Sequence, residues 1–374
     1  MANILDYIDW RGDLDIKKAP FNEVDGLVLS LLSYMELSDI ADGETLRGSV
    51  TLREAVNKCF AKYGDKMPPR GAIMPKEFPA FFRRVADSER YGNMRVLRFK
   101  NVFSAESETQ FAAVCISVGD GSFFVSYRGT DDSLAGWKED FNMSFMDSVP
   151  AQRIALDYLC DAARAMRGRI RIGGHSKGGN LSMYAAINSP KRISRRILNV
   201  YNNDGPGFNR EMTEFEGYSF VKDKMQTTLP HYSVVGLLLE HTKVDKVVKS
   251  TADGIWQHDP FSWEVKGTHF VTEKKLSNEC LAVEKALKSW MSGYDSDERR
   301  EFVEAVYSVF RANGANSLTD IASDKIDFVR SLAKVDSKVR DVIIESGKLL
   351  VREGWNTAQG QWKLRKKSGG DKVK

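Results

Sequence analysis

The sequence predicts an α/β fold, a mostly parallel sheet with helices on both faces. Two observations carry this prediction. Strand-like and helix-like segments alternate through the first 272 residues. The short apolar runs at residues 170–173 and 196–202 are typical of parallel strands, which are covered on both faces. From about residue 274 the apolar spacing becomes helical, which predicts a C-terminal helical region.

The most specific motif is Gly-His-Ser-Lys-Gly at residues 174–178. The run before it predicts a strand, and residues 179–186 after it predict a helix. Strand, Gly-x-Ser-x-Gly turn and helix together form the nucleophile elbow of an α/β-hydrolase. The turn strains the serine backbone and leaves room only for small residues two positions away, where Gly174 and Gly178 stand. A glycine-rich turn without chemistry is the alternative interpretation.

Each remaining element follows from a local pattern. Residues 21–40 have helical spacing with Asn22 as a cap, and residues 62–95 read as loops and short helices. Gly-Asp-Gly at 119–121 joins two β-runs into a hairpin, 111–118 and 122–127. We also expect a helix at 151–166, strands near 233–235 and 246–248, and helices at 281–290, 297–311 and 324–351.

The length of 374 residues suggests more than one structural unit. We expect a hydrolase domain at residues 1–272, a helical extension at 273–358 and a basic, disordered tail at 359–374. Hydrophobic content of 42% and charged content of 28% are ordinary for a globular protein. No apolar run approaches the ~20 residues that span a bilayer, and the first residues lack a secretory signal, so a cytoplasmic location is expected.

The net charge and the cysteine spacing each argue against a class of ligand, nucleic acid and zinc respectively. The net charge of +4 is small, so no nucleic-acid partner is expected. Contact of the basic tail with an anionic membrane surface is the alternative interpretation. No pair has CxxC spacing among the cysteines, which argues against a zinc ribbon and for buried, reduced thiols: Cys59, Cys115, Cys160 and Cys280. No metal and no cofactor is expected.

A serine nucleophile at Ser176 needs a histidine base. His258 fits best, because it lies in a turn-rich segment after the last predicted strand, and the histidine comes last in chain order in this fold. His175 adjoins the serine, but its side chain points away and packs beneath the turn. A solvated loop histidine is the alternative interpretation of His258. The other histidines lack a loop signature: His231, His241 and His269.

The acid that orients the base is predicted at Asp204. It follows the nucleophile, precedes the histidine and lies on a loop after a strand. Asp253 and Glu240 are rivals, whereas Asp245 lies too near the start of a strand. A carboxylate beside Gly-Pro-Gly can also be only a turn-former, and that alternative stays open.

Two backbone donors are predicted to form an oxyanion hole, the N–H of Lys177 and the N–H of Thr130. Gly129 permits the sharp turn that aims the second donor inward. The ammonium of Lys177 is expected at the rim, pointing to water, although it could favour anionic substrates. Trp137 and Asp140 are expected to brace this loop.

The loops at residues 131–150 and 205–226 are predicted to set the substrate length. Their apolar side chains are expected to line an acyl pocket under a mobile lid, and core packing explains them equally well. The residues proposed for substrate binding are Phe141, Phe145, Met146 and Phe208, with Met143, Met212 and Phe215 nearby.

Three motifs resemble those of class 3 lipases: Tyr-Arg-Gly-Thr at 127–130, Trp137-x-x-Asp140, and Gly-His-Ser-Lys-Gly-Gly at 174–179. More closely, the chain resembles a bacterial α/β-hydrolase family of unassigned function that is related to those lipases. The segments that fit this family are Asn-Asp-Gly-Pro-Gly-Phe at 203–208 and Gln-His-Asp at 257–259, with Trp263 beyond. The resemblance spans roughly residues 1–270.

The resemblance implies Ser176 as nucleophile, His258 as base, and Thr130 with Lys177 as oxyanion donors. Two departures stand out. The lipases have a leucine at the place of Lys177, and Ser233 stands where they hold the acid. Either the acid has moved to Asp204, one strand earlier, or the triad is incomplete.

The expected function is a serine hydrolase acting on small-molecule or lipid carboxylic esters, thioesters included, through an acyl-enzyme. The alternative is a catalytically silent scaffold that binds a ligand or a protein partner through its C-terminal helices. The sequence leaves the natural substrate and the oligomeric state open.

Overall fold

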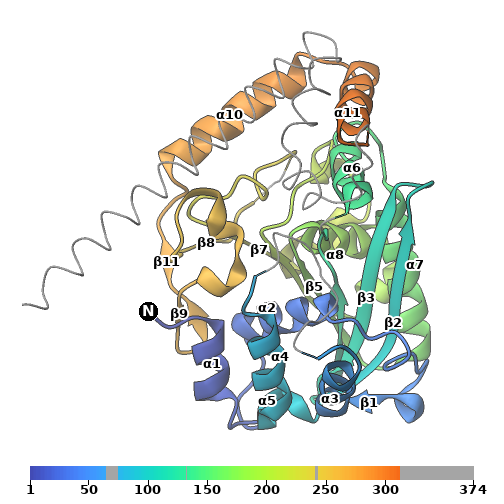
Figure 1. Ribbon diagram of the computed structural model, residues 1–374, viewed down its shortest axis with the longest axis vertical. Coiled ribbons are helices and arrows are strands. Elements are labelled where there is room, and N and C mark those ends of the chain that lie inside the picture. The colour runs from blue at the N-terminus through green and yellow to red at the C-terminus, as the bar shows by residue number, and fades with distance from the viewer. Residues whose placement is uncertain (65–74, 132, 241–242, 312–374) are drawn as a thin grey trace, which may run out of the picture.

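The computed structural model describes residues 1–64, 75–131, 133–240 and 243–311. Within these residues, a nine-stranded sheet has the order β1-β2-β3-β4-β5-β6-β7-β8-β11 (Figure 1). Its strands are β1 Val50–Thr51, β2 Arg95–Ser104, β3 Thr109–Ser117, β4 Ser122–Tyr127, β5 Arg169–His175, β6 Ile197–Asn203, β7 Met225–Pro230, β8 Lys246–Val248 and β11 Thr272–Glu273. A separate pair joins β9 Val265–Lys266 to β10 His269–Phe270.

The five central strands, β4 to β8, run parallel to one another. Antiparallel strands extend the sheet at both edges, β1 to β3 on one side and β11 on the other. Parallel strands need crossover connections, and helices provide them here. The predicted fold class is therefore confirmed: a mixed sheet with a parallel centre, flanked by helices in the manner of an α/β-hydrolase.

Helices cover both faces of the sheet. They are α1 Ile4–Arg11, α2 Glu23–Leu31, α3 Leu52–Tyr63, α4 Phe78–Asp87, α5 Glu89–Gly92, α6 Leu134–Asn142, α7 Pro150–Ala165, α8 Lys177–Asn188, α9 Lys191–Ser194, α10 Asn278–Ser292 and α11 Ser296–Arg311. One core lies between the sheet and α1 to α4, and a second lies between the sheet and α7 with α8. Strand β3 feeds both cores by alternation: Ala112, Val114 and Ile116 into the first, Phe111, Ala113 and Cys115 into the second.

Most predicted elements are confirmed. Asn22 caps α2 with a capping box, and β3 and β4 form the hairpin around Gly119 and Gly121, which both have positive φ. The expected helix at 151–166 is α7, and the expected strands at 196–202 and 246–248 are β6 and β8. Helices α10 and α11 contain the expected segments 281–290 and 297–311. The helix expected at 324–351 and the tail at 359–374 lie outside the described residues.

Two strand predictions need correction. The strand expected near residues 233–235 is wrong, because the ladder ends at Pro230 and that segment is the loop after β7. Strands β2 and β7 were not predicted. Both β2 and β7 contain many polar side chains, so their apolar pattern is weak, and pairing with a neighbouring strand decides their conformation.

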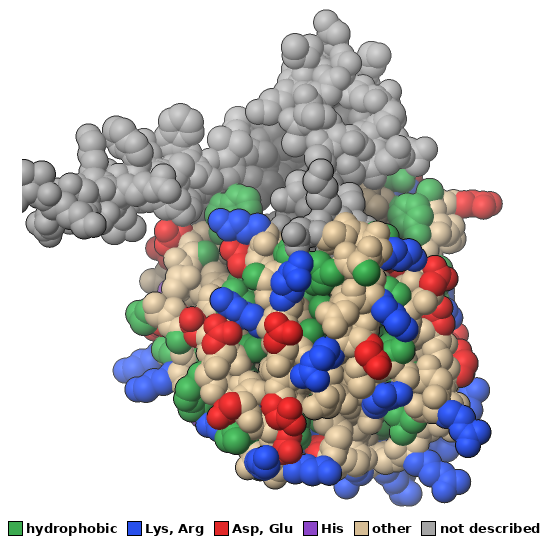
Figure 2. Space-filling view, turned by 60° about the horizontal axis from the view of Figure 1, so that its bottom comes forward, with side chains coloured by type: hydrophobic (Ala, Val, Ile, Leu, Met, Phe, Trp, Pro, Cys, Tyr) green, Lys and Arg blue, Asp and Glu red, His purple; other side chains and the backbone are tan. Residues whose placement is uncertain are grey.

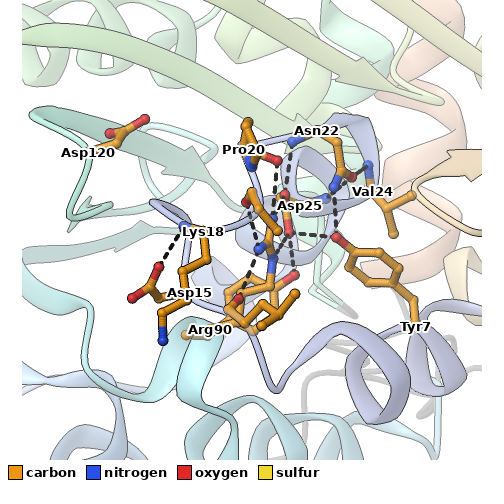
Figure 3. A network of polar contacts seen from close by, with 12 residues as sticks. Tyr7, Asp15, Lys18, Pro20, Asn22, Val24, Asp25, Arg90 and Asp120 are labelled. Carbon is orange, nitrogen blue, oxygen red and sulfur yellow. Dashed lines mark hydrogen bonds and ion pairs between the residues drawn. The ribbon is translucent and has the colours of Figure 1, made fainter.

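The N-terminal helices are joined by a buried ionic network around Asp25 (Figure 3). Its carboxylate accepts two hydrogen bonds from Arg90, at 2.7 and 2.5 Å, and one from each hydroxyl of Tyr7 and Tyr91. The backbone N–H of Asn22 adds a fifth, at 2.9 Å. Burial, together with the Asp25 charge, raises the pKa of both phenols, so they remain donors. The network ties α1, α2 and α5 together.

Helix α2 packs directly on the strands that carry the candidate site. A Cβ on Gly26 would lie 2.8 Å from the ring of Tyr201 in β6, so this close approach requires glycine. The hydroxyl of Ser126 donates to the carbonyl of Ser30 at 3.0 Å, and the amide of Asn203 donates to the Ser30 hydroxyl at 3.3 Å. Helix α2 thus holds the central strands in place from one face of the sheet.

The C-terminal helices contact the body of the protein. Lys138 on α6 forms ion pairs with Glu108 and with Glu304 on α11, both at 2.7 Å. Arg299 of α11 also donates to the carbonyl of Ser144 at 2.9 Å. Helix α11 therefore packs beside α6, as Figure 1 shows.

The charged side chains on the surface agree with the small net charge. On the face that Figure 2 shows, basic and acidic side chains are interspersed. Cys59, Cys115 and Cys280 are buried, as expected, whereas Cys160 is only half-buried. Among the described residues, no helix combines the length and apolar character that crossing a membrane requires.

We predict that Asp25→Ala lowers the free energy of unfolding by about 3–5 kcal/mol, because it leaves the buried guanidinium of Arg90 without its counter-charge. Urea unfolding followed by circular dichroism measures this loss. The exposed pair of Lys62 and Asp39 provides the control. Asp39 has a positive φ of 65°, so the charge is removed by Asp39→Asn, which should leave the unfolding curve nearly unchanged. Equal curves for the wild type and Asp25→Ala would contradict the central role of the network.

Candidate active site

Strand register brings the predicted site residues to one edge of the sheet. His175 at the end of β5 pairs with Asn203 at the end of β6, so Ser176 and Asp204 each follow directly. Tyr127 at the end of β4 pairs with Gly174, which places the loop of Thr130 at the same edge. In open α/β sheets, ligands bind beyond these carboxyl ends of the strands.

Ser176 occupies a strained elbow. Its φ of 58° and ψ of −135° lie outside the ordinary regions for a residue with a side chain. A Cβ on Gly174 would lie 2.2 Å from the carbonyl carbon of Gly178, and one on Gly178 would lie 2.1 Å from the carbonyl oxygen of Tyr127. Ser176 is half-buried, whereas the residues on either side of it are buried. The turn thus holds the serine outward at the N-terminus of α8.

His258 and Asp204 form a hydrogen-bonded pair. Nδ1 of the ring lies 2.6 Å from Oδ2 of the carboxylate, which is fully buried, while 24% of the His258 side chain is exposed. A carboxylate oxygen accepts, so the neutral ring carries its proton on Nδ1 and keeps a lone pair on Nε2. Asp204 itself has a φ of 54°, a conformation that aspartate tolerates better than most residues.

The other candidates for the acid and the base lie away from this pair. Glu240 forms an ion pair with Lys288 on α10 at 3.3 Å, and Asp253 lies exposed before the short helix at Gly254–His258. Among the other histidines, His231 contacts the carbonyl of Lys275 and His269 is largely exposed. His241 lies outside the described residues.

Ser233 contacts the Asp204 carboxylate, a bond that the sequence did not predict. It lies in the loop after β7, and its hydroxyl donates to Oδ1 of Asp204. His258 binds the other oxygen of the same carboxylate. The two residues therefore share Asp204.

His175 packs beneath the turn, as expected, and also holds the loop of His258. Its Nε2–H donates to the carbonyl oxygen of His258 at 2.9 Å, so its Nδ1 is left to accept from the hydroxyl of Tyr34 at 3.2 Å. The two imidazole centroids are 4.6 Å apart. Burial, and then the charge of His258, lowers the pKa of His175 well below its usual 6.5. His175 is therefore a neutral clamp.

The loop after β4 passes close to the elbow. A Cβ on Gly129 would lie 2.2 Å from the Tyr34 hydroxyl and 3.1 Å from Cβ of Ser176. Close approach, rather than the sharp turn that we expected, is what requires glycine here. The Thr130 hydroxyl donates to Oδ2 of Asp140 on α6, and burial raises the pKa of that carboxyl to about 6. Asp140 therefore braces this loop, as the sequence predicts.

The expectation that Lys177 points to water is wrong. Its side chain is 1% exposed, and its ammonium lies 2.5 Å from Glu139 on α6 and 3.1 Å from the carbonyl of Gln110. Glu139 also accepts from the backbone N–H groups of Gln110 and Ala151. A buried lysine needs such a partner, and its charge is consequently neutralised within the protein. It is not available to attract an anionic substrate.

The residues predicted to bind substrate divide into two groups. Phe208 is 3% exposed and packs on Phe215 in the core, so core packing accounts for it. Phe141 at the end of α6 is 47% exposed, and Met146 is half-buried against a small cluster beneath it. Phe145 is half-buried, with Arg300 of α11 5.5 Å from its ring centre. These three residues are near the surface of the α6 region.

Fold and site together define an α/β protein with a strained Gly-x-Ser-x-Gly turn and an Asp–His pair with a buried carboxylate at the carboxyl edge of its sheet. A family model described as Mbeg1-like matches residues 85–308. This match covers more than half of the 374 residues. The chain belongs to the Mbeg1-like family.

Among solved structures, the chain is similar to the crystal structure of M37 lipase, at 16% sequence identity and a TM-score of 0.32. That similarity covers 49% of this chain and 69% of the lipase chain. It is too distant to transfer an activity or a residue role. No curated protein matches the chain. Among the described residues, no group of three or more histidine, cysteine, aspartate or glutamate side chains could hold a metal ion.

We predict that His175 makes folding stability depend on pH. The unfolded chain takes up a proton on this residue below pH 6.5, while the folded chain does not, so stability is lost as pH falls through that value. Between pH 7.5 and 5.5 the wild type should lose about 1 kcal/mol more than His175→Gln, whose amide still donates to His258. Urea unfolding at each pH measures this difference.

His269→Gln, at an exposed histidine, is the matched control and should follow the wild type. Parallel pH profiles for the wild type and His175→Gln would show that residue 175 titrates normally.

Proposed function

We propose that this protein is a serine hydrolase that cleaves carboxylic esters through an acyl-enzyme on Ser176. Thioesters fall within the same chemistry. The observation that supports the proposal most is the 2.6 Å bond between His258 and Asp204, at the same sheet edge as the strained elbow. A hydroxyl on such an elbow becomes a nucleophile when an oriented imidazole can take its proton.

In the proposed mechanism, Nε2 of His258 accepts the Ser176 proton as the hydroxyl attacks the ester carbonyl. Asp204 stabilises the imidazolium through its bond to Nδ1. The imidazolium then protonates the leaving alkoxide or thiolate. Water, deprotonated by the same nitrogen, releases the acid from Ser176.

The backbone N–H of Lys177, at the start of α8, is one proposed donor to the oxyanion. Thr130 supplies the second through its N–H, because its hydroxyl proton is engaged by Asp140. Loss of one such donor typically costs ~10²–10³ in rate. The Lys177–Glu139 pair joins α8 to α6, so the two donors are held by connected elements.

For the substrate, we propose a small-molecule or lipid ester whose acyl chain contacts the apolar side chains of Phe141, Phe145 and Met146. Phe208 is omitted because it belongs to the core. The buried charge of Lys177 gives no reason to expect an anionic acyl group.

A fluorophosphonate probe tests the nucleophile. We expect covalent labelling of the wild type at Ser176, located by peptide mass spectrometry, and complete loss of labelling in Ser176→Ala. Ser182→Ala removes a buried serine of the same helix and should leave labelling unchanged. A folded wild-type chain that takes no label would favour the catalytically silent scaffold.

The acid is tested by turnover of nitrophenyl esters of graded chain length. Asp204→Asn should lower kcat by up to ~10⁴-fold, because the amide presents the wrong partner to Nδ1 of His258. Asp253→Asn, at an exposed position, should retain wild-type turnover. A larger effect of Asp253→Asn than of Asp204→Asn would overturn the assignment of the acid.

A further inference from the structure

The Asp204 carboxylate has a donor on each oxygen. Oδ2 accepts from His258, and Oδ1 accepts from the hydroxyl of Ser233. Asp204 and Ser233 are both almost completely buried, so water does not replace either bond. Loss of one of these donors would leave a buried, charged oxygen without a hydrogen bond, which costs free energy. The carboxylate could then also rotate.

The direction of the Ser233 hydroxyl bond is fixed by its neighbours. The backbone N–H of Gly236 donates to Oγ of Ser233 at 3.0 Å, so the single hydroxyl proton is directed to Asp204. A Cβ on Gly236 would lie 2.6 Å from both Oγ of Ser233 and Oδ1 of Asp204. Glycine at 236 is therefore the residue that lets this turn close around the carboxylate.

Helix α10 holds the same turn through Cys280. The Ser233 N–H donates to the sulfur at 3.2 Å, and the thiol donates to the Ser233 carbonyl at 3.1 Å. The bond that the thiol donates requires a protonated sulfur, and burial raises the pKa of Cys280 to about 11. The contact is an exchange of two hydrogen bonds between one buried residue of α10 and the backbone of Ser233.

We propose that Ser233 is a positioning residue for the acid Asp204, and that the Cys280 thiol on α10 extends this support into the C-terminal helices. The inference rests on the proposed function. Ser233 holds one carboxylate oxygen so that the other faces Nδ1 of His258. It also draws negative charge away from the oxygen that His258 binds. Orientation and charge at the acid thus depend on a loop and a helix that carry no reacting atom.

The experiment measures kcat/KM for a nitrophenyl ester against pH. Ser233→Ala should lower kcat by about 10- to 100-fold with little change in KM. Losses of this size are typical when a residue that orients a functional side chain through a hydrogen bond is removed. The acid limb of the profile should move to higher pH, because the carboxylate then stabilises the protonated imidazole more strongly. A role in folding alone does not move that limb. Ser233→Thr keeps the hydroxyl and should recover most of the rate.

Cys280 gives an independent pair of variants. Cys280→Ser keeps a donor and an acceptor and should stay close to the wild type, whereas Cys280→Ala should lose several-fold in kcat. Ser189→Ala, at a buried serine bonded to the Ala186 carbonyl, is the control and should behave as the wild type. This pair decides the question if Ser233→Ala does not fold.

The outcomes separate the two proposals. A folded wild type that neither turns over the ester nor labels at Ser176 overturns the proposed function, and with it the inference. An active wild type whose rate and pH profile are unchanged in Ser233→Ala, or in Cys280→Ala, overturns the inference alone.

Discussion

The pairing of β5 with β6 is the constraint on which the site depends. It sets His175 opposite Asn203, so the next residue on each strand leaves the sheet at the same level. Both of those residues, Ser176 and Asp204, have positive φ, and each turns its chain sharply out of the sheet. A shift of one residue in this register would separate the hydroxyl from the carboxylate and reverse the faces of the shifted strand.

Side chains around this edge are then held from several directions. His175 clamps the His258 loop from below, and the indole N–H of Trp263 donates to the carbonyl of Gln257 in the same loop at 2.8 Å. On the other side of the elbow, the Lys177–Glu139 pair anchors α6. The proposed mechanism requires such preorganisation, because developing charge is then stabilised without rearrangement.

The C-terminal helices take part in the same arrangement. Helix α10 reaches the loop of Ser233, and α11 packs on α6, so both contact segments that follow strands at the carboxyl edge of the sheet. The family match ends at residue 308, within α11. A domain boundary at residue 272 stays a proposal. Through these contacts, α10 and α11 help to hold the segments around the candidate site.

Local signals in the sequence predicted what local geometry determines. The elbow, its two glycines, the Asn22 cap and the β3–β4 hairpin each depend on a few adjacent residues. The choice of His258 and Asp204 followed from chain order, and the structure brings the two together.

What the sequence could not predict depends on distant partners. Lys177 is buried because Glu139 lies beside it, and the Tyr34–His175 bond joins residues 141 positions apart. No local pattern signals such pairs. The weakly apolar strands β2 and β7 were missed for the same reason, since their neighbours in the sheet define them.

The crystal structure of the phosphonylated protein would test the central claim most directly. The account predicts phosphorus bonded to Oγ of Ser176, Nε2 of His258 within ~3 Å of that oxygen, and the phosphonyl oxygen facing the N–H groups of Lys177 and Thr130. A phosphonyl group on another residue, or a His258 ring turned away from Ser176 with its Asp204 bond broken, would contradict it.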